Sequence, residues 1–312
     1  MKKLITRRTA VKRLFQISGA VAFSKIDWPL RGTEEIWAQK PETGFIVEGL
    51  GQTEGYSTKE LTRKIFDAAG GMARFISRGD VVVIKPNISW ARRPELAATT
   101  NPEVLEAVIE LCYDCGAKKV RIADHTIHDA RRCFAITGVG SVAKKTDADL
   151  VMPRSSLMKK MKIHGHRLEI WPVFVPLVEA DKVINLPIAK DHGLSTLTLG
   201  IKNWIGGVGG RRYALHQDIH QTIVDLAQFF KPTVTLIDAT RIMVTNGPSG
   251  GSLSDVAVKN ALILCDDQIA ADAAAAKLFG VNPANLGFIS LGEKWGLGTS
   301  NLSKLNRKKV II

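Results

Sequence analysis

The sequence predicts an α/β protein with a doubly wound, mostly parallel sheet, helices on both faces and a small β-hairpin insertion. Residues 81–84 form a short apolar run between Gly79-Asp80 and Pro86, which is typical of a strand buried on both faces. A helical pattern then begins at Pro102 and stops at Gly116, and residues 118–123 form the next strand pattern. A strand, a helix and a strand in this order are the crossover unit of parallel sheets.

The same alternation continues toward the C-terminus. It predicts strands at 182–186, 233–237 and 261–265, and helices at 196–204, 219–230 and 268–279. Residues 162–168 predict a hairpin that turns at Gly165. Because no repeat of fixed period is present, we expect one domain over residues 40–312.

Composition excludes several classes of protein. Of the 312 residues, 45% are hydrophobic and 23% are charged, which are globular proportions. The four cysteines are too few for a dense disulfide framework or for a ferredoxin-type run. A 4Fe–4S cluster on this chain is therefore not expected, and the composition leaves other cofactors undetermined.

The formal net charge of +13 favours an anionic partner. A nucleic acid would call for stacking aromatic residues or a recognition helix on a basic face, and aromatic residues are only 6% of the chain. We therefore expect a small anionic ligand and no nucleic acid.

The N-terminus resembles a twin-arginine export signal. Arg7-Arg8 precede the uncharged stretch 14–23, which is too short to span a bilayer as a helix and suits the apolar region of a signal peptide. We expect residues 1–39 to be signal peptide and linker, the protein to be periplasmic or otherwise extracytoplasmic, and the chain to have no transmembrane span. The alternative is a basic amphipathic first helix.

Polar residues follow the predicted strands, at the edge where open α/β sheets place their ligand sites. Each one alone also has a structural explanation, as a helix cap or a lysine that extends from a strand end. Their recurrence favours a common pocket. The candidates at strand ends are Lys85, Asn87, Asp124, His125, Lys190 and Asp238.

Lys202 and Asn203 lie inside the apolar segment that we expect to be a helix. An unpaired ammonium group would be costly there, so Lys202 is expected to be paired or to face a ligand. Gly206-Gly207-Val208-Gly209-Gly210 follows as a loop whose backbone could wrap an anion, although it lacks the spacing of a phosphate-binding fingerprint.

His192 is the leading candidate for acid/base chemistry, with His216 second and Asp124 as the carboxylate. His192 is two residues after Lys190, so on an extended segment both side chains point the same way and the cation lowers the imidazole pKa. The alternative is that His192 caps a helix beginning near Ser195.

His216 and His220 are four residues apart, a spacing that stacks two imidazoles on one helix face and permits a shared metal. Gln217 stands where the zincin pattern has its glutamate, so metalloprotease chemistry has no base. The alternative to a metal is a capped helix start with one histidine facing a ligand or the core.

These segments together resemble domain of unknown function 362, an α/β family of bacteria and archaea. The resemblance rests on Val83-Ile84-Lys85-Pro86-Asn87, on Leu186 to His192, on Ile201-Lys202-Asn203, and on Ile237-Asp238 with Asn246-Gly247-Pro248. It covers most of residues 45–300 and adds Asn246 to the candidate binding residues. Many relatives carry a ferredoxin-like module for two 4Fe–4S clusters, and the cysteines for that module are missing here.

Two functions fit these residues. The first is an exported enzyme that acts on a small anionic substrate or organic cofactor through a Lys/His/Asp pocket, because lysine holds carboxylate or phosphate while a neutral histidine moves a proton. The alternative is a non-catalytic cofactor- or ligand-binding subunit of an exported redox complex, with a redox partner subunit.

Overall fold

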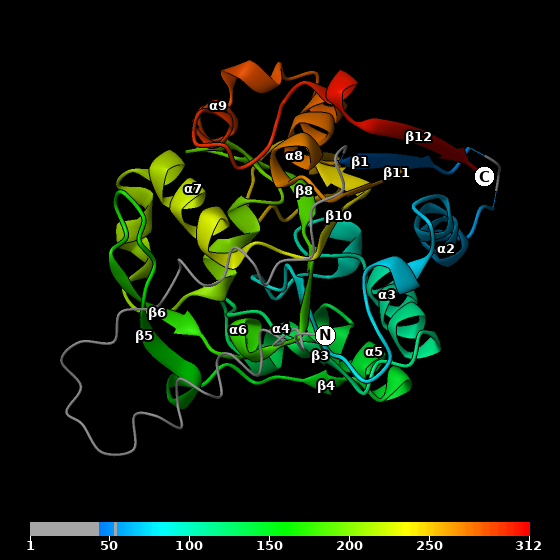
Figure 1. The fold of residues 1–312 in the computed structure, drawn as a ribbon, viewed down its shortest axis with the longest axis horizontal. Helices are drawn as coiled ribbons and strands as arrows, with labels where there is room; N and C mark the ends of the chain where they lie inside the picture. Colours follow the sequence, from blue (N-terminus) through cyan, green and yellow to red (C-terminus); the bar gives the residue numbers. More distant parts are fainter. Residues whose placement is uncertain (1–43, 53–54) are drawn as a thin grey trace, which may run out of the picture.

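The computed structural model describes residues 44–52 and 55–312, and residues 1–39, for which a signal peptide and linker are predicted, lie outside them. The main sheet has the strand order β12-β1-β11-β10-β7-β2-β3-β4, with β8 paired to β10 and β9 paired to β8. Most neighbouring strands are parallel; the antiparallel pairs are β1 with β11, β10 with β11 and β8 with β9. The predicted α/β fold class is confirmed (Figure 1).

The elements follow the predicted alternation. The strands are β1 (Phe45–Leu50), β2 (Val81–Pro86), β3 (Lys119–Ile122), β4 (Asp149–Leu150), β5 (Met158–Lys162), β6 (Ile170–Phe174), β7 (Lys182–Leu186), β8 (Ile188–His192), β9 (Thr196–Thr198), β10 (Val234–Met243), β11 (Val256–Cys265) and β12 (Asn306–Ile311). The α-helices are α2 (Thr58–Ala68), α3 (Pro102–Asp114), α4 (Ala130–Ile136), α5 (Val139–Thr146), α6 (Pro176–Glu179), α7 (Ile219–Phe230), α8 (Gln268–Ala276) and α9 (Gly287–Lys294).

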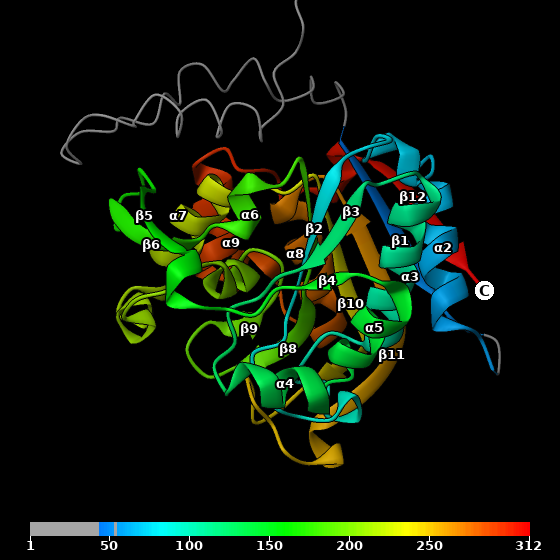
Figure 2. The same ribbon diagram turned by 90° about the horizontal axis from the view of Figure 1, so that it is seen from below.

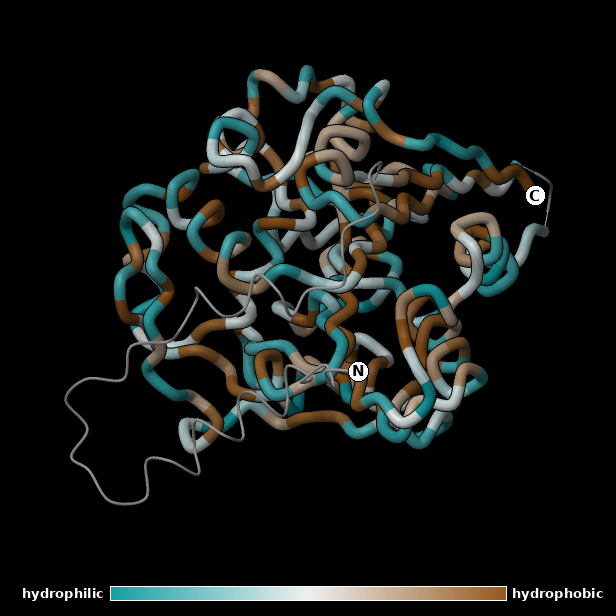
Figure 3. The backbone as a smooth tube through the Cα atoms, viewed as in Figure 1, coloured by the Kyte–Doolittle hydropathy of each residue, from teal (hydrophilic) through white to brown (hydrophobic). Residues whose placement is uncertain are grey.

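Helices cover both faces of the sheet because successive strand residues point to opposite sides. In β2, Val82 and Ile84 pack into the core under α2, α3 and α5, whereas Val83 packs into the core under α7, α8 and α9. Figure 2 shows these two groups of helices on opposite sides of the strands. Figure 3 shows that the brown, hydrophobic segments run through the interior strands and that teal segments lie mostly outside.

The predicted hairpin is present as the separate two-stranded sheet of β5 and β6. Its turn is held by the buried carboxylate of Asp225 on α7, which accepts hydrogen bonds from the backbone N–H groups of His166, Arg167 and Leu168. The insertion is therefore fixed to the domain at its turn.

The predicted helix over 196–204 is wrong. Thr196–Thr198 instead form β9, and after a turn a 3-10 helix covers Lys202–Gly207. Alternating Thr and Leu suits a strand, and β8 offers it a partner. The buried carboxylate of Asp272 accepts the N–H groups of Gly200 and Ile201, so the chain turns there rather than entering a helix earlier.

Two other boundaries differ from the prediction. Lys190, which the sequence places at a strand end, lies within β8, because after Pro187 the chain resumes pairing with β10. Asp238 lies within β10, which continues to Met243 instead of ending there. Within the residues that the model describes, no helix combines the length and apolar character needed to cross a membrane.

Candidate functional site

The centre of the site is a buried ion pair between Lys85 at the end of β2 and Asp124 after β3. Lys85 Nζ lies 2.7 Å from Asp124 Oδ1, and neither side chain is more than 1% exposed. Lys85 also donates to the Pro86 carbonyl and to Asn203 Oδ1, each at 2.9 Å. The ammonium group of Lys85 therefore has two hydrogen-bond acceptors and a carboxylate beside it.

Asparagines surround this pair and connect it to the neighbouring strands. Asn203 Oδ1 accepts from Lys85 and from Asn87 Nδ2, and Asn203 Nδ2 donates to Asn185 Oδ1 at 2.9 Å. The other Asp124 oxygen accepts from the Ile88 N–H at 2.7 Å. Asn203 thus joins β2 and β7 at their carboxyl ends.

Lys190 and Lys202 extend the cluster without a carboxylate of their own. Lys190 Nζ donates to the Ala98 carbonyl at 2.6 Å and to Asn87 Oδ1 at 3.5 Å, and Lys202 Nζ donates to Thr198 Oγ1 at 3.2 Å. In the part of the chain that the model describes, neither ammonium group forms an ion pair within 4.0 Å. Burial lowers the pKa of Lys190 well below its usual value, and the charge of Lys202 adds to that effect.

His192 and His216 lie beside these lysines with their rings stacked. Their ring centroids are 6.3 Å apart and the ring planes differ by 10°. Burial first, and then the charges of Lys202, His216 and Lys190, lower the pKa of His192 from 6.5 to about 3. The pKa of His216 is lowered by burial and by Lys202. Both imidazoles are therefore neutral at neutral pH.

The backbone contacts fix opposite tautomers for these two rings. His192 Nδ1 accepts from the N–H groups of Leu194 and Ser195, so its proton is on Nε2. His216 Nδ1 contacts the Arg212 carbonyl at 3.2 Å, and since a carbonyl only accepts, Nδ1 carries the proton and Nε2 carries the lone pair. One ring thus offers an N–H and the other a lone pair. His192 accepts backbone N–H groups as a helix cap would, but these groups belong to the β8–β9 turn and not to a helix. The predicted helix cap is therefore wrong.

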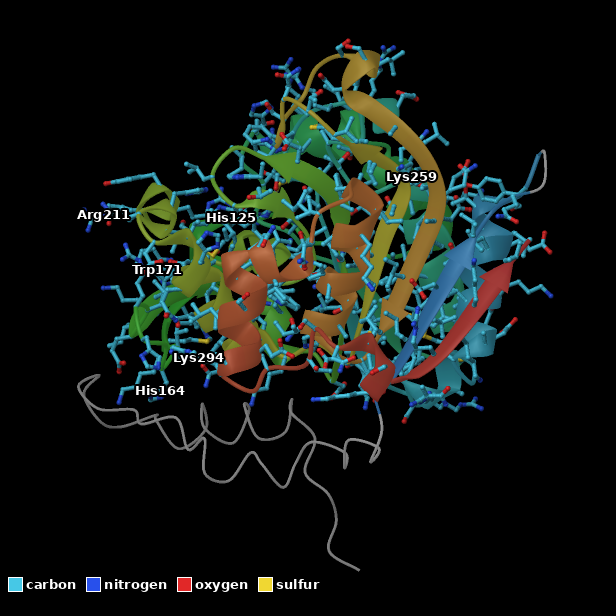
Figure 4. All side chains as sticks on the ribbon, turned by 90° about the horizontal axis from the view of Figure 1, so that it is seen from above. His125, His164, Trp171, Arg211, Lys259 and Lys294 are labelled. Carbon is cyan, nitrogen blue, oxygen red and sulfur yellow. The ribbon has the colours of Figure 1, made fainter. Side chains whose placement is uncertain are left out.

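Arg212 and His125 lie on the other side of the ion pair. Arg212 donates to the carbonyls of His125 and Thr126 at 2.6 and 2.5 Å, and His125 Nδ1 contacts the Val208 carbonyl at 2.8 Å. Burial lowers the pKa of His125. His125 lines an open groove of about 430 Å³ whose other walls include Arg154, Lys160 and Gly210. Figure 4 shows His125 and Arg211 on the same side of the molecule.

Three of the sequence candidates do not join the cluster. Asp238 accepts from the backbone N–H of Asn101 and from Thr240, and Asn246 Nδ2 donates to Asp255 Oδ1 at 2.6 Å. The Asp238 carboxylate is therefore hydrogen-bonded inside β10, and the Asn246 amide is hydrogen-bonded in the loop that follows this strand. Their hydrogen-bonding groups have structural partners.

His220 is the third of these candidates. The predicted common helix face is wrong, because His216 ends the 3-10 helix Arg212–His216 while His220 belongs to α7, which Asp218 caps. His220 packs against Phe288 instead. The described residues contain no group of three or more His, Cys, Asp or Glu side chains placed to hold a metal.

Asn185 belongs to the site and is not among the predicted candidates. Asn185 is a fully buried amide in the apolar strand β7, and such a polar residue in a buried strand is the signal that could have indicated it. The sequence predicts that the backbone of residues 206–210 wraps an anion, but its carbonyl groups are used within the protein. The Gly206 and Val208 carbonyls contact the backbone N–H and Nδ1 of His125, and the Gly209 carbonyl accepts from Trp171 Nε1. The segment holds the neighbouring hairpin and His125.

The fold and this cluster define an α/β protein with a buried, cationic polar site. The chain belongs to the family described as "Domain of unknown function (DUF362)", whose model matches residues 82–277. A thylakoid-associated protein of Synechocystis sp. (strain ATCC 27184 / PCC 6803 / Kazusa) is 27% identical over 243 residues, which are 75% of this chain and 74% of that protein.

Two solved structures are distantly similar. One is the lactate racemase apoprotein from Thermoanaerobacterium thermosaccharolyticum, with 14% identity and a TM-score of 0.49 over 81% of this chain. The other is a Thermotoga maritima protein, with 10% identity and a TM-score of 0.45 over 71% of this chain. The chain spans 58% and 59% of the lengths of these two structures.

Gly206 has no room for a side chain, which gives a test of the ion pair. A Cβ atom at this position would lie 2.0 Å from Asp124 Oδ1 and 2.7 Å from Lys85 Nζ. We expect Gly206→Ala to lower the free energy of unfolding by about 2–3 kcal/mol, because the buried pair must separate. Urea titration measures this. Gly193→Ala, where a Cβ meets nothing within 4 Å, is the matched control; equal stability of both variants would contradict this account of the site.

The lowered pKa of His192 predicts a pH dependence of stability. Because the folded-state pKa is about 3 and the ordinary value is 6.5, the unfolded chain binds the extra proton between these values. The contribution of His192 to stability is therefore present above pH 6.5 and is lost as the pH falls toward 3. We expect His192→Asn, which keeps an acceptor near Nδ1, to reduce this slope in urea titrations at a series of pH values. His164→Asn, at an exposed histidine of the β5–β6 hairpin, should leave the slope unchanged; a slope that His192→Asn does not alter would assign it to other groups.

Proposed function

We propose that the chain is an enzyme that binds a small anionic organic molecule beside Lys190 and Lys202 and moves a proton to or from it with His192 and His216. The observation that carries this proposal is the pair of buried lysine side chains for which the described residues provide no carboxylate partner. An anionic ligand would supply the negative charge that the described residues do not place beside these two lysines.

The charge balance of the cluster supports an anion. Lys85, Lys190 and Arg212 lie near one carboxylate, that of Asp124, which is already engaged by Lys85, and Lys202 adds a further amine beside Lys190. A buried cation that lacks a partner destabilises the folded state, as the lowered pKa of Lys190 shows. A bound carboxylate or phosphate would offset this cost and accept the remaining ammonium protons.

The paired histidines support chemistry in addition to binding. The Nε2–H of His192 can donate to a ligand oxygen, and the Nε2 lone pair of His216 can accept a proton from the ligand. Because both rings are held by backbone groups, these roles are set before a ligand arrives. A purely binding site would not need one donor and one acceptor imidazole stacked 6.3 Å apart.

A groove beside His125 adds exposed positive charge to the surface. Arg154 and Lys160 line it and both are exposed, whereas Lys190 and Lys202 do not line it. Since cationic walls raise the local concentration of anions, the groove would attract anions to the molecule without itself being the proposed binding site. The alternative, a non-catalytic ligand- or cofactor-binding subunit of a redox complex, would use the same charges without turnover.

Anion binding can be tested through stability. We expect pyruvate, oxalate or phosphate to raise the free energy of unfolding at constant ionic strength, by about 2.7 kcal/mol at a hundred times the Kd, and acetone, an uncharged match for pyruvate, to have no such effect. Lys190→Met should lose this stabilisation while remaining about as stable as the unaltered chain in anion-free buffer, because it removes a buried charge that lacks a carboxylate.

Lys259→Met is the matched control for that variant, since Lys259 is an exposed lysine of β11 on another part of the molecule (Figure 4). It should keep the full anion effect. If no anion stabilises the chain, the proposed function is wrong. If Lys190→Met responds as the unaltered chain does, the anion binds elsewhere and the proposed site is wrong.

We also propose that the chain is exported by the twin-arginine route, which the order of Arg7-Arg8 and the uncharged stretch 14–23 supports. Changing both arginines to lysine keeps the charge and removes the arginine pair. We expect this variant to stay in the cytoplasm, measured by fractionating the native host. Export of the double variant at the unaltered level would contradict the proposal.

A further inference from the structure

We propose that Lys202 is a nucleophile that forms an imine with the carbonyl carbon of a small 2-oxo acid, while Lys190 holds the carboxylate of that acid. This inference rests on the proposed anion site and names the substrate class and the covalent step. It is supported by the position of the Lys202 amine beside the β8–β9 pair. Among the described residues, this amine also has no carboxylate partner.

The β8–β9 ladder places the relevant groups on one face. Lys190 lies opposite Thr198 in the antiparallel register, so their side chains share a face of the sheet. Lys202 Nζ donates to Thr198 Oγ1 at 3.2 Å, which brings its amine to the side of Lys190. His192 is two residues after Lys190 on the same strand and therefore points to the same face.

The three buried lysines differ in how they are used. Lys85 has two hydrogen-bond acceptors and an ion pair, and Lys190 has two acceptors. Among the described residues, Lys202 has the Thr198 hydroxyl as its hydrogen-bond partner. It is also 7% exposed, whereas Lys85 and Lys190 are each 1% exposed. Lys202 is therefore the amine that a small molecule can reach and that is least held by the protein.

The surroundings of Lys202 favour a free amine. Burial lowers the pKa of Lys202 from 10.5 to about 7, so a large fraction of this side chain is unprotonated at neutral pH. A desolvated lysine beside other cations is the kind of amine that forms imines with carbonyl substrates. Lys190 and His192 face it from β8, and His216 faces it from the 3-10 helix Arg212–His216.

The step balances with the groups present. The amine lone pair of Lys202 forms the C–N bond while the carbonyl π electrons move to oxygen, which accepts a hydrogen bond from Nε2–H of His192. His216 Nε2 takes one proton from nitrogen and gives it to the alkoxide oxygen, which forms the carbinolamine. It then takes the second nitrogen proton and gives it to the hydroxyl oxygen as the C–O bond breaks, so water leaves with both amine protons and the C=N bond forms. No electrons are lost or gained, so no oxidant or reductant is needed.

The β8–β9 turn lies over this face. The turn between β8 and β9 passes over His192, where the N–H groups of Leu194 and Ser195 contact the ring, and Leu194 is 62% exposed. Figure 2 shows β8 and β9 together with α4 at one end of the molecule. A small acid that enters beside this turn would meet His192, Lys202 and Lys190.

The test is to trap the imine with borohydride. The full chain is incubated with pyruvate at pH 7, reduced with sodium borohydride, digested and mapped by mass spectrometry. We expect the reduced adduct on Lys202 at more than about ten times its level on the exposed Lys259, and we expect trapping to increase as the pH rises through 7. Lys202→Met should lose the adduct and Lys259→Met should keep it. Mapping the adduct in the unaltered chain decides the site even if Lys202→Met fails to fold.

The possible outcomes separate this inference from the proposed function. If pyruvate stabilises the chain but the adduct is absent from Lys202 or spread evenly over the lysines, the covalent step is wrong and anion binding stands. If pyruvate neither stabilises the chain nor is trapped while oxalate or phosphate stabilises it, the 2-oxo acid is the wrong substrate class. If no anion stabilises the chain and no adduct forms, both proposals are wrong.

Discussion

The buried ion pair between Lys85 and Asp124 is the interaction on which the rest of the site depends. It lies where two adjacent parallel strands end, and it leaves so little room that Gly206 must pass without a side chain. The Asn203 amide accepts from Lys85 and donates to Asn185 and to the Lys85 carbonyl, so the pair also fixes the chain that follows β9. A buried pair of this kind is weak evidence for stability, because desolvation offsets the attraction of the charges. Its clearer consequence here is position, since it sets where Lys202 and Asn203 lie.

Once Asp124 is committed to Lys85, the protein retains buried positive charge. Lys190 and Lys202 keep carbonyl, amide and hydroxyl partners, which are dipoles rather than opposite charges. A sequence selected for stability alone would place apolar residues of similar volume at these two positions. Lys190 and Lys202 break the general rule that buried charges are paired, and exceptions to this rule are concentrated at functional sites. The histidines are affected in the same way, because burial first and then the cations beside them lower the pKa of both rings and keep them neutral.

How far the sequence predicts this site depends on the topology. Lys85, Asp124 and Lys190 could be predicted because β3, β2 and β7 are neighbours, so residues that follow these strands meet at one edge. Asp238 and Asn246 could not be excluded from sequence: β10 continues past Asp238, and Asp255 arrives from another segment to take the Asn246 amide. The helix predicted over 196–204 fails because β9 pairs with the preceding strand β8 and because the carboxylate of Asp272, remote in sequence, accepts the N–H groups at the turn that follows. His220 fails because Asp218 begins a new helix between the two histidines.

The opposite tautomers of His192 and His216 follow from local backbone geometry that a residue pattern does not contain. The β8–β9 turn directs two N–H donors at one ring, whereas the 3-10 helix directs a carbonyl at the other. A hairpin turn and a helix end differ in which backbone N–H or C=O groups remain without a backbone partner. A histidine at the turn and a histidine at the helix end therefore take opposite hydrogen-bonding roles. The donor and the acceptor are therefore built by the fold itself, and the side chains supply only the imidazoles. This places the chemical polarity of the site in the backbone of residues 192–195 and 212–216, where a substitution that shifts the chain should exchange or abolish these roles even when both histidines remain.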